Sequence, residues 1–250
     1  MPAKEKALTL IELKNVHFTY PGGIRVLSNL DFKLGEGEKV GLIGPNGSGK
    51  TTLFHIIMGL LKPDSGHITI FGRECREEKD FKTARREIGL LFQDPDDQLF
   101  SPTVLEDLAF GPLNQGKSVR EAKRIAREVL EMLGLSGFED RITYKLSGGE
   151  KKLVALGTIL AMKPRVLLLD EPTTALDPGT TERIIQILKE IDVSYVFISH
   201  NMDFLLQMAD KIYGMENGRL ILEEDSIPHT HVHIHPSGRI QHTHSGGDMH

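Results

Sequence analysis

The sequence has a single cysteine, Cys75, and no apolar run that approaches the ~20 residues needed to span a bilayer. One cysteine excludes an internal disulfide framework and is typical of a protein kept in a reducing cytosol. Charged residues at Lys4, Glu5 and Lys6 leave no apolar core for a secretory signal. We therefore expect a cytosolic protein, and any part it plays in a membrane process must go through a partner.

A concentrated basic surface is also missing. The formal net charge is −5, and the densest group of cations, within residues 79–86, is interrupted by acidic residues. This balance predicts that nucleic acid is not the main ligand. With 250 residues, the chain suits one large α/β domain or one domain with a subdomain.

Apolar patterns divide the chain into sections. Alternation over residues 8–18 and 27–34 predicts an antiparallel sheet at the start. Residues 95–163 are helical in character, and their clearest helix opens with a capping box formed by Ser118 and Glu121. We expect this section to form a helical subdomain.

The last third of the chain alternates between strands and helices. The continuous apolar run 166–169 predicts a central strand covered on both faces. A helix over 180–191, a strand over 195–198 and a helix over 202–208 follow, and Asn-Gly then turns a hairpin within 211–222. This order indicates a largely parallel core sheet.

The clearest chemical signal is a glycine-rich segment between a predicted strand at 38–43 and a predicted helix at 52–61. It reads Gly44, Pro45, Asn46, Gly47, Ser48, Gly49, Lys50, Thr51, Thr52. The glycines let the backbone wrap phosphates, the ammonium of Lys50 reaches the terminal phosphates, and the Thr51 hydroxyl can ligate magnesium. A plain glycine-rich turn is the alternative, and the strand–loop–helix order favours the nucleotide site.

A second anion site is predicted where Leu146, Ser147, Gly148, Gly149 and Glu150 precede a largely apolar helix at 151–162. The start of a helix leaves backbone N–H groups bare, with the positive end of the helix dipole behind them. Small-residue clusters also mark ordinary turns, so the segment gains its meaning from the motifs around it.

Two acidic residues, Asp170 and Glu171, close the central strand. Ligand sites in open α/β sheets gather at the carboxyl ends of strands, which places Asp170 to hold magnesium directly or through water. Glu171, aimed differently, is a candidate general base for an attacking water. The alternative is that two acidic residues close this strand by chance. That alternative would be favoured if the phosphate loop were absent.

In this order, the motifs resemble the nucleotide-binding subunit of an ATP-binding cassette (ABC) transporter over about residues 8–225. The resemblance implies an α/β P-loop NTPase of ABC type, with a mixed parallel core sheet, an N-terminal antiparallel β-subdomain and an inserted helical subdomain. The expected boundaries are 1–94 and 164–225 for the RecA-like core with its β-subdomain, 95–163 for the helical signature subdomain, and 226–250 for a His-rich tail without order.

The resemblance also implies roles, with ATP and Mg²⁺ as cofactors. Catalytic roles go to Glu171, to His200 as the switch histidine at the γ-phosphate, and to Gln93 of the Q-loop, which touches magnesium or the attacking water and senses the membrane partner. Thr51, Gln93 and Asp170 would serve magnesium. Nucleotide contacts would come from Tyr20 stacking on adenine, the Walker A segment 44–52, the signature residues Ser147, Gly148 and Gly149, and Asp177 of the D-loop.

Subunits of this family pair head to tail, so that Walker A of one copy and the signature helix of the other sandwich each ATP. The resemblance implies a second ATPase subunit, with a homodimer favoured, and transmembrane energy-coupling and substrate-binding subunits. The chain would lie peripherally on the cytoplasmic face of the cell membrane. Glu150 departs from the family pattern, which has glutamine at this position.

Residues 92–100, Phe-Gln-Asp-Pro-Asp-Asp-Gln-Leu-Phe, are similar to the Q-loop of energy-coupling-factor transporters, which import vitamins and nickel or cobalt ions. The alternative is an acidic surface loop. The similarity predicts a loop that faces the coupling helices of a transmembrane partner.

The His-rich tail favours a metal ion over a vitamin as the transported substrate. Seven of the eleven histidines fall within residues 229–250, where imidazoles suit nickel, cobalt, copper and zinc. Interleaving with Thr, Val, Ile and Ser argues against a purification tag. We expect the ATPase of a nickel or cobalt importer, nickel slightly preferred, with the tail as a metal buffer or sensor. The candidate tail ligands are His229, His231, His233, His235, His242 and His244.

Three alternatives remain at this point. The first is an energy-coupling-factor ATPase for vitamin uptake. The second is a soluble ABC-type ATPase, of chromosomes or DNA repair or with a metal-storing tail. Fewer than a hundred residues separate Lys50 from Leu146, which leaves no room for the long insertions of the chromosomal class. The third, a metal-binding protein with a vestigial ATPase, is disfavoured by the intact Lys50, Asp170, Glu171 and His200.

Overall fold

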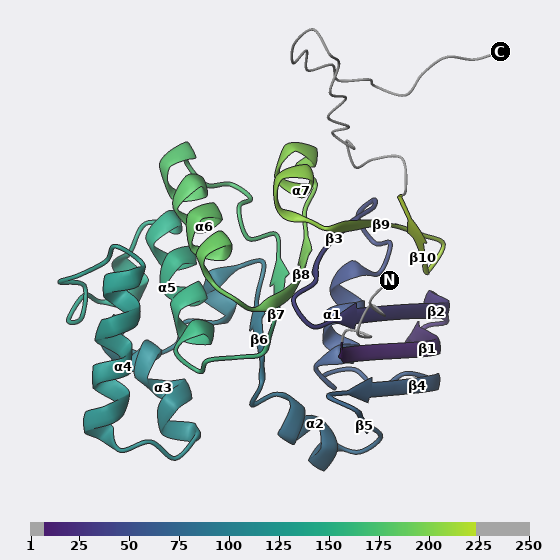
Figure 1. The fold of residues 1–250 in the computed structure, drawn as a ribbon, viewed down its shortest axis with the longest axis horizontal. Helices are drawn as coiled ribbons and strands as arrows, with labels where there is room; N and C mark the ends of the chain where they lie inside the picture. The colour runs from purple at the N-terminus through teal and green to yellow at the C-terminus, as the bar shows by residue number, and fades with distance from the viewer. Residues whose placement is uncertain (1–7, 224–250) are drawn as a thin grey trace, which may run out of the picture.

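The two alternating segments at the start of the chain pair as neighbouring strands of an antiparallel sheet (Figure 1). The structure is a computed structural model that describes residues 8–223. The predicted tail 226–250 and its histidines lie outside the described residues. The first sheet has the order β2-β1-β4-β5. Its strands are β1 (Thr9–Tyr20), β2 (Ile24–Gly35), β4 (Ser65–Ile70) and β5 (Arg73–Glu74).

The second sheet is six-stranded, in the order β10-β9-β3-β8-β7-β6. Its strands are β3 (Lys39–Ile43), β6 (Ile88–Leu91), β7 (Val166–Asp170), β8 (Ser194–Ile198), β9 (Lys211–Glu216) and β10 (Arg219–Leu222). All neighbours from β9 to β6 run parallel, and β10 turns back antiparallel on β9. The sheet is therefore mixed, as predicted. Every residue of β7 and β8 is buried, which explains why they are apolar apart from Asp170 at the end of β7 and Ser194 at the start of β8.

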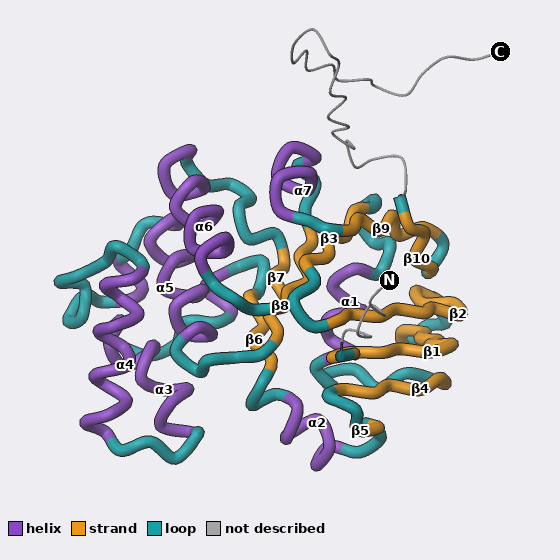
Figure 2. The backbone as a smooth tube through the Cα atoms, in the orientation of Figure 1, coloured by secondary structure: helices purple, strands orange, loops and turns teal. Residues whose placement is uncertain are grey.

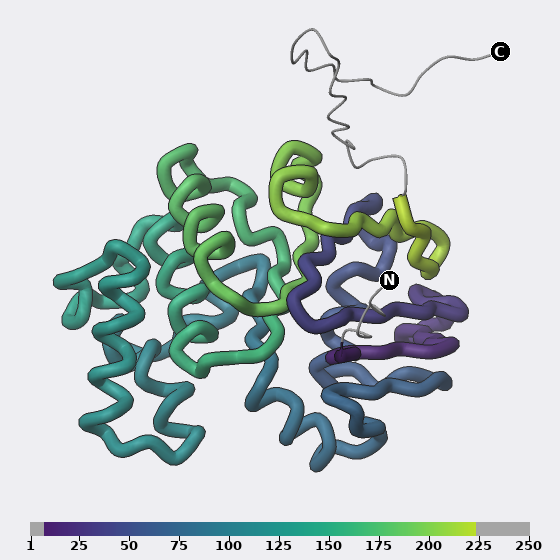
Figure 3. The backbone as a smooth tube through the Cα atoms, viewed as in Figure 1, coloured from purple at the N-terminus to yellow at the C-terminus, as the bar shows by residue number. Residues whose placement is uncertain are grey.

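Helices fall into two groups (Figure 2). The helices α3 (Val104–Asn114), α4 (Val119–Met132) and α5 (Gly148–Leu160) gather on the side away from β1, β2 and β4, as the teal segment of Figure 3 shows. The others connect strands: α1 (Lys50–Ile57), α2 (Glu78–Ala84), α6 (Pro178–Glu190) and α7 (Met202–Met208). The helical group lies within the section predicted at 95–163, whose boundaries stay a proposal.

The helix α1 fixes the position of the glycine-rich loop before it. Leu53, Phe54, Ile56 and Ile57 are fully buried, and one apolar cluster joins them to strands of both sheets. Each such side chain contributes about 1.5–3 kcal/mol by leaving water. The loop 44–49 is therefore held between two rigid elements, β3 and α1.

Two local predictions differ from the structure. The helix expected over 52–61 ends at Ile57, because Gly59 adopts φ +66 and turns the chain. The capping box expected at Ser118 is half made: the Ser118 hydroxyl accepts from the amide of Glu121 at 3.2 Å. The Glu121 carboxylate pairs instead with Lys117 at 3.1 Å, one helical turn back. Within residues 8–223, no helix combines the length and apolarity required to cross a bilayer.

Candidate functional site

An open pocket of about 720 Å³ lies at the carboxyl ends of the parallel strands. Most of the residues proposed from the sequence line it, although they come from distant parts of the chain: Tyr20, Asn46, Gly47, Gly49, Lys50, Thr51, Thr52, Gln93, Asp170, Glu171 and His200. Pro45 and Ser48 line a neighbouring hollow on the outer side of the same loop. The strand ends of a parallel sheet thus converge on one cavity.

The glycine-rich loop needs its glycines for close approach. A Cβ on Gly44 would lie 2.6 Å from the Met215 carbonyl, and Gly49, at φ +110, would push a Cβ to 2.8 Å from Val26. Inside the loop, the Lys50 ammonium donates to the carbonyls of Gly44 at 2.8 Å and Pro45 at 3.0 Å. Burial lowers the pKa of Lys50, and the nearby carboxylates of Glu171 and Asp170 oppose that change. Lys50 lines the pocket together with the loop residues Asn46, Gly47 and Gly49.

Thr51 and Asp170 meet directly. The Thr51 hydroxyl donates to Asp170 Oδ2 at 2.7 Å, and the Asp170 side chain is almost completely buried. Burial raises the pKa of Asp170, with the neighbouring charge of Glu171 acting in the same direction and the Thr51 bond opposing it. A hydroxyl and a carboxylate oxygen in contact are the hard ligands that Mg²⁺ takes in nucleotide sites, so this pair fits that ion.

Glu171 is oriented away from Asp170 by an unusual backbone conformation. Its φ is +48, a region that costs a residue with a side chain of order 1–3 kcal/mol. One carboxylate oxygen accepts from the Thr174 hydroxyl at 2.5 Å. The other, Oε1, is buried, lies 3.4 Å from His200 Nε2, and has no hydrogen-bond partner among residues 8–223. A buried carboxylate oxygen without a partner beside a histidine is a candidate proton acceptor.

Tyr20 lies at the edge of the pocket. Its hydroxyl is 3.1 Å from the Thr52 hydroxyl, and its ring meets Phe18 edge-to-face with centroids 4.8 Å apart. These contacts fix the ring beside Ile24 and Val26, which also line the pocket. A fixed aromatic face of this kind offers about 1–3 kcal/mol of stacking to a base.

The predicted second anion site is not in this pocket. Ser147 caps α5, and Gly148 lines an adjacent groove of about 750 Å³ with the loop after β6. This groove meets the Lys50 pocket at Thr51, Gln93 and Asp170, which line both. Asp177 lies outside the pocket too: it caps α6, accepting from the Thr180 amide at 3.0 Å. A Cβ on Gly149 would lie 2.9 Å from the Thr180 hydroxyl, so α5 and α6 touch here. One chain therefore does not join Ser147, Gly148 and Gly149 to Lys50.

Glu150 turns back on its own helix. Its carboxylate accepts from the Ser147 amide at 2.8 Å and from the Arg141 guanidinium at 2.7 Å. The Ser147 amide, followed by Arg141, holds the pKa of Glu150 below its usual range. The side chain that departs from the family pattern is thus engaged in a capping box, and its charge is paired with Arg141.

Lys152 was not predicted from the sequence as part of the site. It lies in the second turn of α5 and is 2% exposed. Its ammonium donates to the carbonyls of Gln93 at 2.8 Å and Phe92 at 3.1 Å, and burial lowers its pKa to about 8. The sequence offers one sign of this role, which is a lysine at a core-facing position of a largely apolar helix. Arg141 and Thr174 were missed as well, and single residues in loops carry no such signal.

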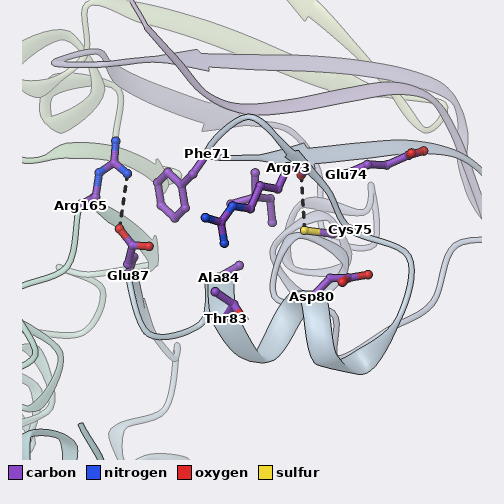
Figure 4. A pocket seen from close by; sticks show the side chains of 10 residues that line it. Phe71, Arg73, Glu74, Cys75, Asp80, Thr83, Ala84, Glu87 and Arg165 are labelled. Carbon is purple, nitrogen blue, oxygen red and sulfur yellow. Dashed lines mark hydrogen bonds and ion pairs between the residues drawn. The ribbon is translucent and has the colours of Figure 1, made fainter.

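A smaller hollow, of about 190 Å³, lies among β5, α2 and Arg165 (Figure 4). Arg165 pairs with Glu87 at 3.3 Å and covers the Phe71 ring at 4.4 Å. Burial, with the charge of Asp80, raises the pKa of Cys75, which makes its thiol a poor nucleophile. Among residues 8–223, no cluster of three His, Cys, Asp or Glu side chains is arranged to hold a metal ion.

The chain is similar to proteins of known family. The pattern of the family described as ABC transporter matches residues 27–174. The energy-coupling factor transporter ATP-binding protein EcfA of Methanothermobacter thermautotrophicus is 45% identical over 218 residues, which cover 86% of this chain and 70% of that protein. The solved structure of cbiO1 from Clostridium perfringens, part of the ABC transporter complex cbiONQ, has a TM-score of 0.77 at 34% identity and covers 87% of this chain and 88% of that one. The dimeric ATP-binding cassette MJ0796, bound to ADP and Pi after hydrolysis, has a TM-score of 0.78 at 32% identity, covering 84% and 96%.

Proposed function

Because this chain is an ATPase of the ABC transporter family, we propose that it powers an energy-coupling-factor importer whose substrate is a nickel or cobalt ion. The pocket that joins Lys50, Thr51 and Asp170 to Glu171 carries the ATPase part of this proposal. The similarity to EcfA and to cbiO1 supports the transporter type. The His-rich segment 229–250 supports a metal substrate, since interleaved imidazoles suit these ions.

The residues divide the chemistry among them. The loop amides and Lys50 hold the β- and γ-phosphates, and Tyr20 stacks on the adenine. Mg²⁺, bound by Thr51 and Asp170 with Gln93 nearby, would supply charge neutralisation on the phosphates. Glu171 takes a proton from water as the water oxygen bonds to the γ-phosphorus, the bond to the bridging oxygen breaks, and ADP and phosphate leave. His200 donates a hydrogen bond to the γ-phosphate.

Two copies of the chain would complete two such sites. Gly148 lines a groove that does not include Lys50, and Ser147 and Gly149 lie outside the Lys50 pocket, so the start of α5 is free to meet the phosphates of a second copy. The N-terminus of α5 supplies the bare amides and the dipole that an anion requires. ATP that binds the closed pair more tightly than the open one would drive closure, and hydrolysis would release it. Membrane-spanning partners would convert this cycle into import.

Purification of the intact transporter tests the substrate. An affinity tag on this chain, followed by gentle detergent extraction, should co-purify membrane subunits. In vesicles loaded with ATP on the side of this chain, we expect uptake of radioactive nickel or cobalt, and none with Glu171→Gln. Uptake of a vitamin in place of both metals would overturn the metal proposal. For the tail, calorimetry with nickel should show binding to the full chain and not to a chain that ends at residue 225.

The pair of Arg141 and Glu150 makes a separate prediction. Arg141→Met exposes the Glu150 charge near the partner's γ-phosphate, and we expect ATP-driven dimerisation to weaken about 3- to 10-fold, which is roughly 1 kcal/mol of repulsion at a solvated site. Adding Glu150→Gln removes that charge and should restore dimerisation. Analytical ultracentrifugation at several ATP concentrations measures both. If Arg141→Met stays impaired after Glu150→Gln, charge pairing is not the role of Arg141.

A further inference from the structure

The loop that carries Gln93 is fastened to helix α5 at both ends. At its start, the carbonyls of Phe92 and Gln93 accept from Lys152 Nζ at 3.1 and 2.8 Å. At its end, the Gln98 amide donates to the Ala155 carbonyl at 2.7 Å and to the Thr158 hydroxyl at 2.8 Å, while its oxygen accepts from the Phe92 amide at 3.2 Å. The loop is thus bonded to the first three turns of α5.

Burying the Lys152 ammonium costs desolvation free energy, and the fold alone gives no reason to place a lysine here. Its neighbours Leu153 and Val154 are apolar and buried, and even a buried ion pair is often replaced by apolar residues with no loss of stability. Lys151, beside it, already ties α5 to the loop by pairing with Asp96 at 2.6 Å nearer the surface. The reason for a buried cation therefore lies in what its two hydrogen bonds hold.

Those bonds hold the backbone of a residue that faces the nucleotide. Gln93 lines both the pocket of Lys50 and the groove of Gly148. The helix that holds its backbone begins with Ser147, Gly148 and Gly149, the residues proposed to meet the ATP of the second copy. A displacement of α5 by docking on that ATP would be passed through Lys152 to Gln93 in the chain's own pocket.

We propose that Lys152 is a positioning residue that ties Gln93 to α5, so that docking of the signature residues on one ATP sets Gln93 at the other. This inference rests on the proposed function, because it takes Gln93 to act in hydrolysis. Lys152 itself touches neither nucleotide nor water in this scheme. Its contribution is the geometry of the Gln93 backbone, and an error of about 1 Å in such geometry can cost 10²-fold in rate.

A double-mutant cycle with Gln93 tests the proposal. We expect Lys152→Met to lower kcat of the full-length ATPase about tenfold and to leave KM for ATP within about twofold. In the Gln93→Ala background, Lys152→Met should cost no further activity, because the residue it positions is gone. Lys123→Met, an exposed lysine on α4, is the control and should match the wild type in both backgrounds.

Hydrogen exchange provides a readout that does not depend on hydrolysis. Without nucleotide, the amides of residues 92–98 should exchange faster in Lys152→Met than in the wild type, and those of β7 should not. Unchanged exchange in the loop, or equal losses of kcat with and without Gln93, would overturn the role of Lys152. If the wild type hydrolyses no ATP but residues 92–98 still exchange faster in the variant, the proposed function is wrong instead. If Lys152→Met does not fold, Lys152→Gln, which keeps one donor, takes its place in the same cycle and exchange measurements.

Discussion

Replacing Glu171 by glutamine is expected to slow ATP hydrolysis by about 10²–10⁴-fold, the range for loss of a general base, while ATP still binds. The amide has nearly the shape of the carboxylate and can keep the contact with Thr174, whose hydroxyl lies 2.5 Å from Glu171 Oε2. It cannot accept the proton of the attacking water from the buried position of Oε1. The phosphate loop and the Thr51–Asp170 pair are unaffected, so nucleotide affinity should stay within a few-fold.

Two measurements check this expectation. Phosphate release gives kcat, with the exposed Glu182→Gln on α6 as a matched control that should retain full activity. Light scattering with ATP should show Glu171→Gln shifting from monomer to dimer, since the closed pair would no longer be released by hydrolysis. Unchanged turnover would remove Glu171 from the catalytic role, and a persistent monomer would count against the shared site.

Gly148→Asp is expected to abolish ATP-driven dimerisation and to reduce hydrolysis by at least about 100-fold, the cost of losing one well-placed anion donor. The physical reason is a negative charge placed where a second copy's γ-phosphate would dock. Within the chain the change is harmless: a Cβ on Gly148 has no atom within 4 Å among residues 8–223, and its backbone is not left-handed. An aspartate in the first turn also suits the helix dipole.

The test is specific because Gly148→Asp should impair dimerisation and hydrolysis and leave the stability of the fold unchanged. The melting temperature of Gly148→Asp and the affinity of its monomer for ATP should equal those of the wild type. Gly149→Ala is the informative companion, because its Cβ would lie 2.9 Å from the Thr180 hydroxyl and should lower the melting temperature. A Gly148→Asp protein that dimerises normally with ATP would show that this glycine does not face a second copy.

The sequence predicted the α/β fold correctly because its signals are local. The glycine-rich loop sits between an apolar strand and an apolar helix, and the run 166–169 is a strand buried on both faces. The parallel sheet follows from the alternation of such elements, and its strand ends explain why Thr51 and Asp170 meet. The ABC family assignment, made from the order of the motifs, is confirmed by the match over residues 27–174.

The rest depends on contacts between residues far apart in the chain. Lys152 and Gln93 are separated by 59 residues, and a lysine inside an apolar helix gives no hint of which carbonyls it serves. The same holds for Arg141, whose pairing with Glu150 depends on the path of an irregular loop. The helix after the glycine-rich loop ends several residues earlier than predicted, because Gly59 turns the chain. Apolar periodicity alone does not indicate such a turn.

The hydrogen bond between Thr51 and Asp170 also describes the chain before any cation arrives. The Thr51 hydroxyl oxygen and Asp170 Oδ2 lie 2.7 Å apart, so the two oxygens that would hold an ion are already side by side. A metal ion held by this pair would meet two oxygen ligands that the fold has already placed together. Little conformational entropy would be lost in holding it, which would leave more of the free energy of metal binding for closing two subunits on ATP.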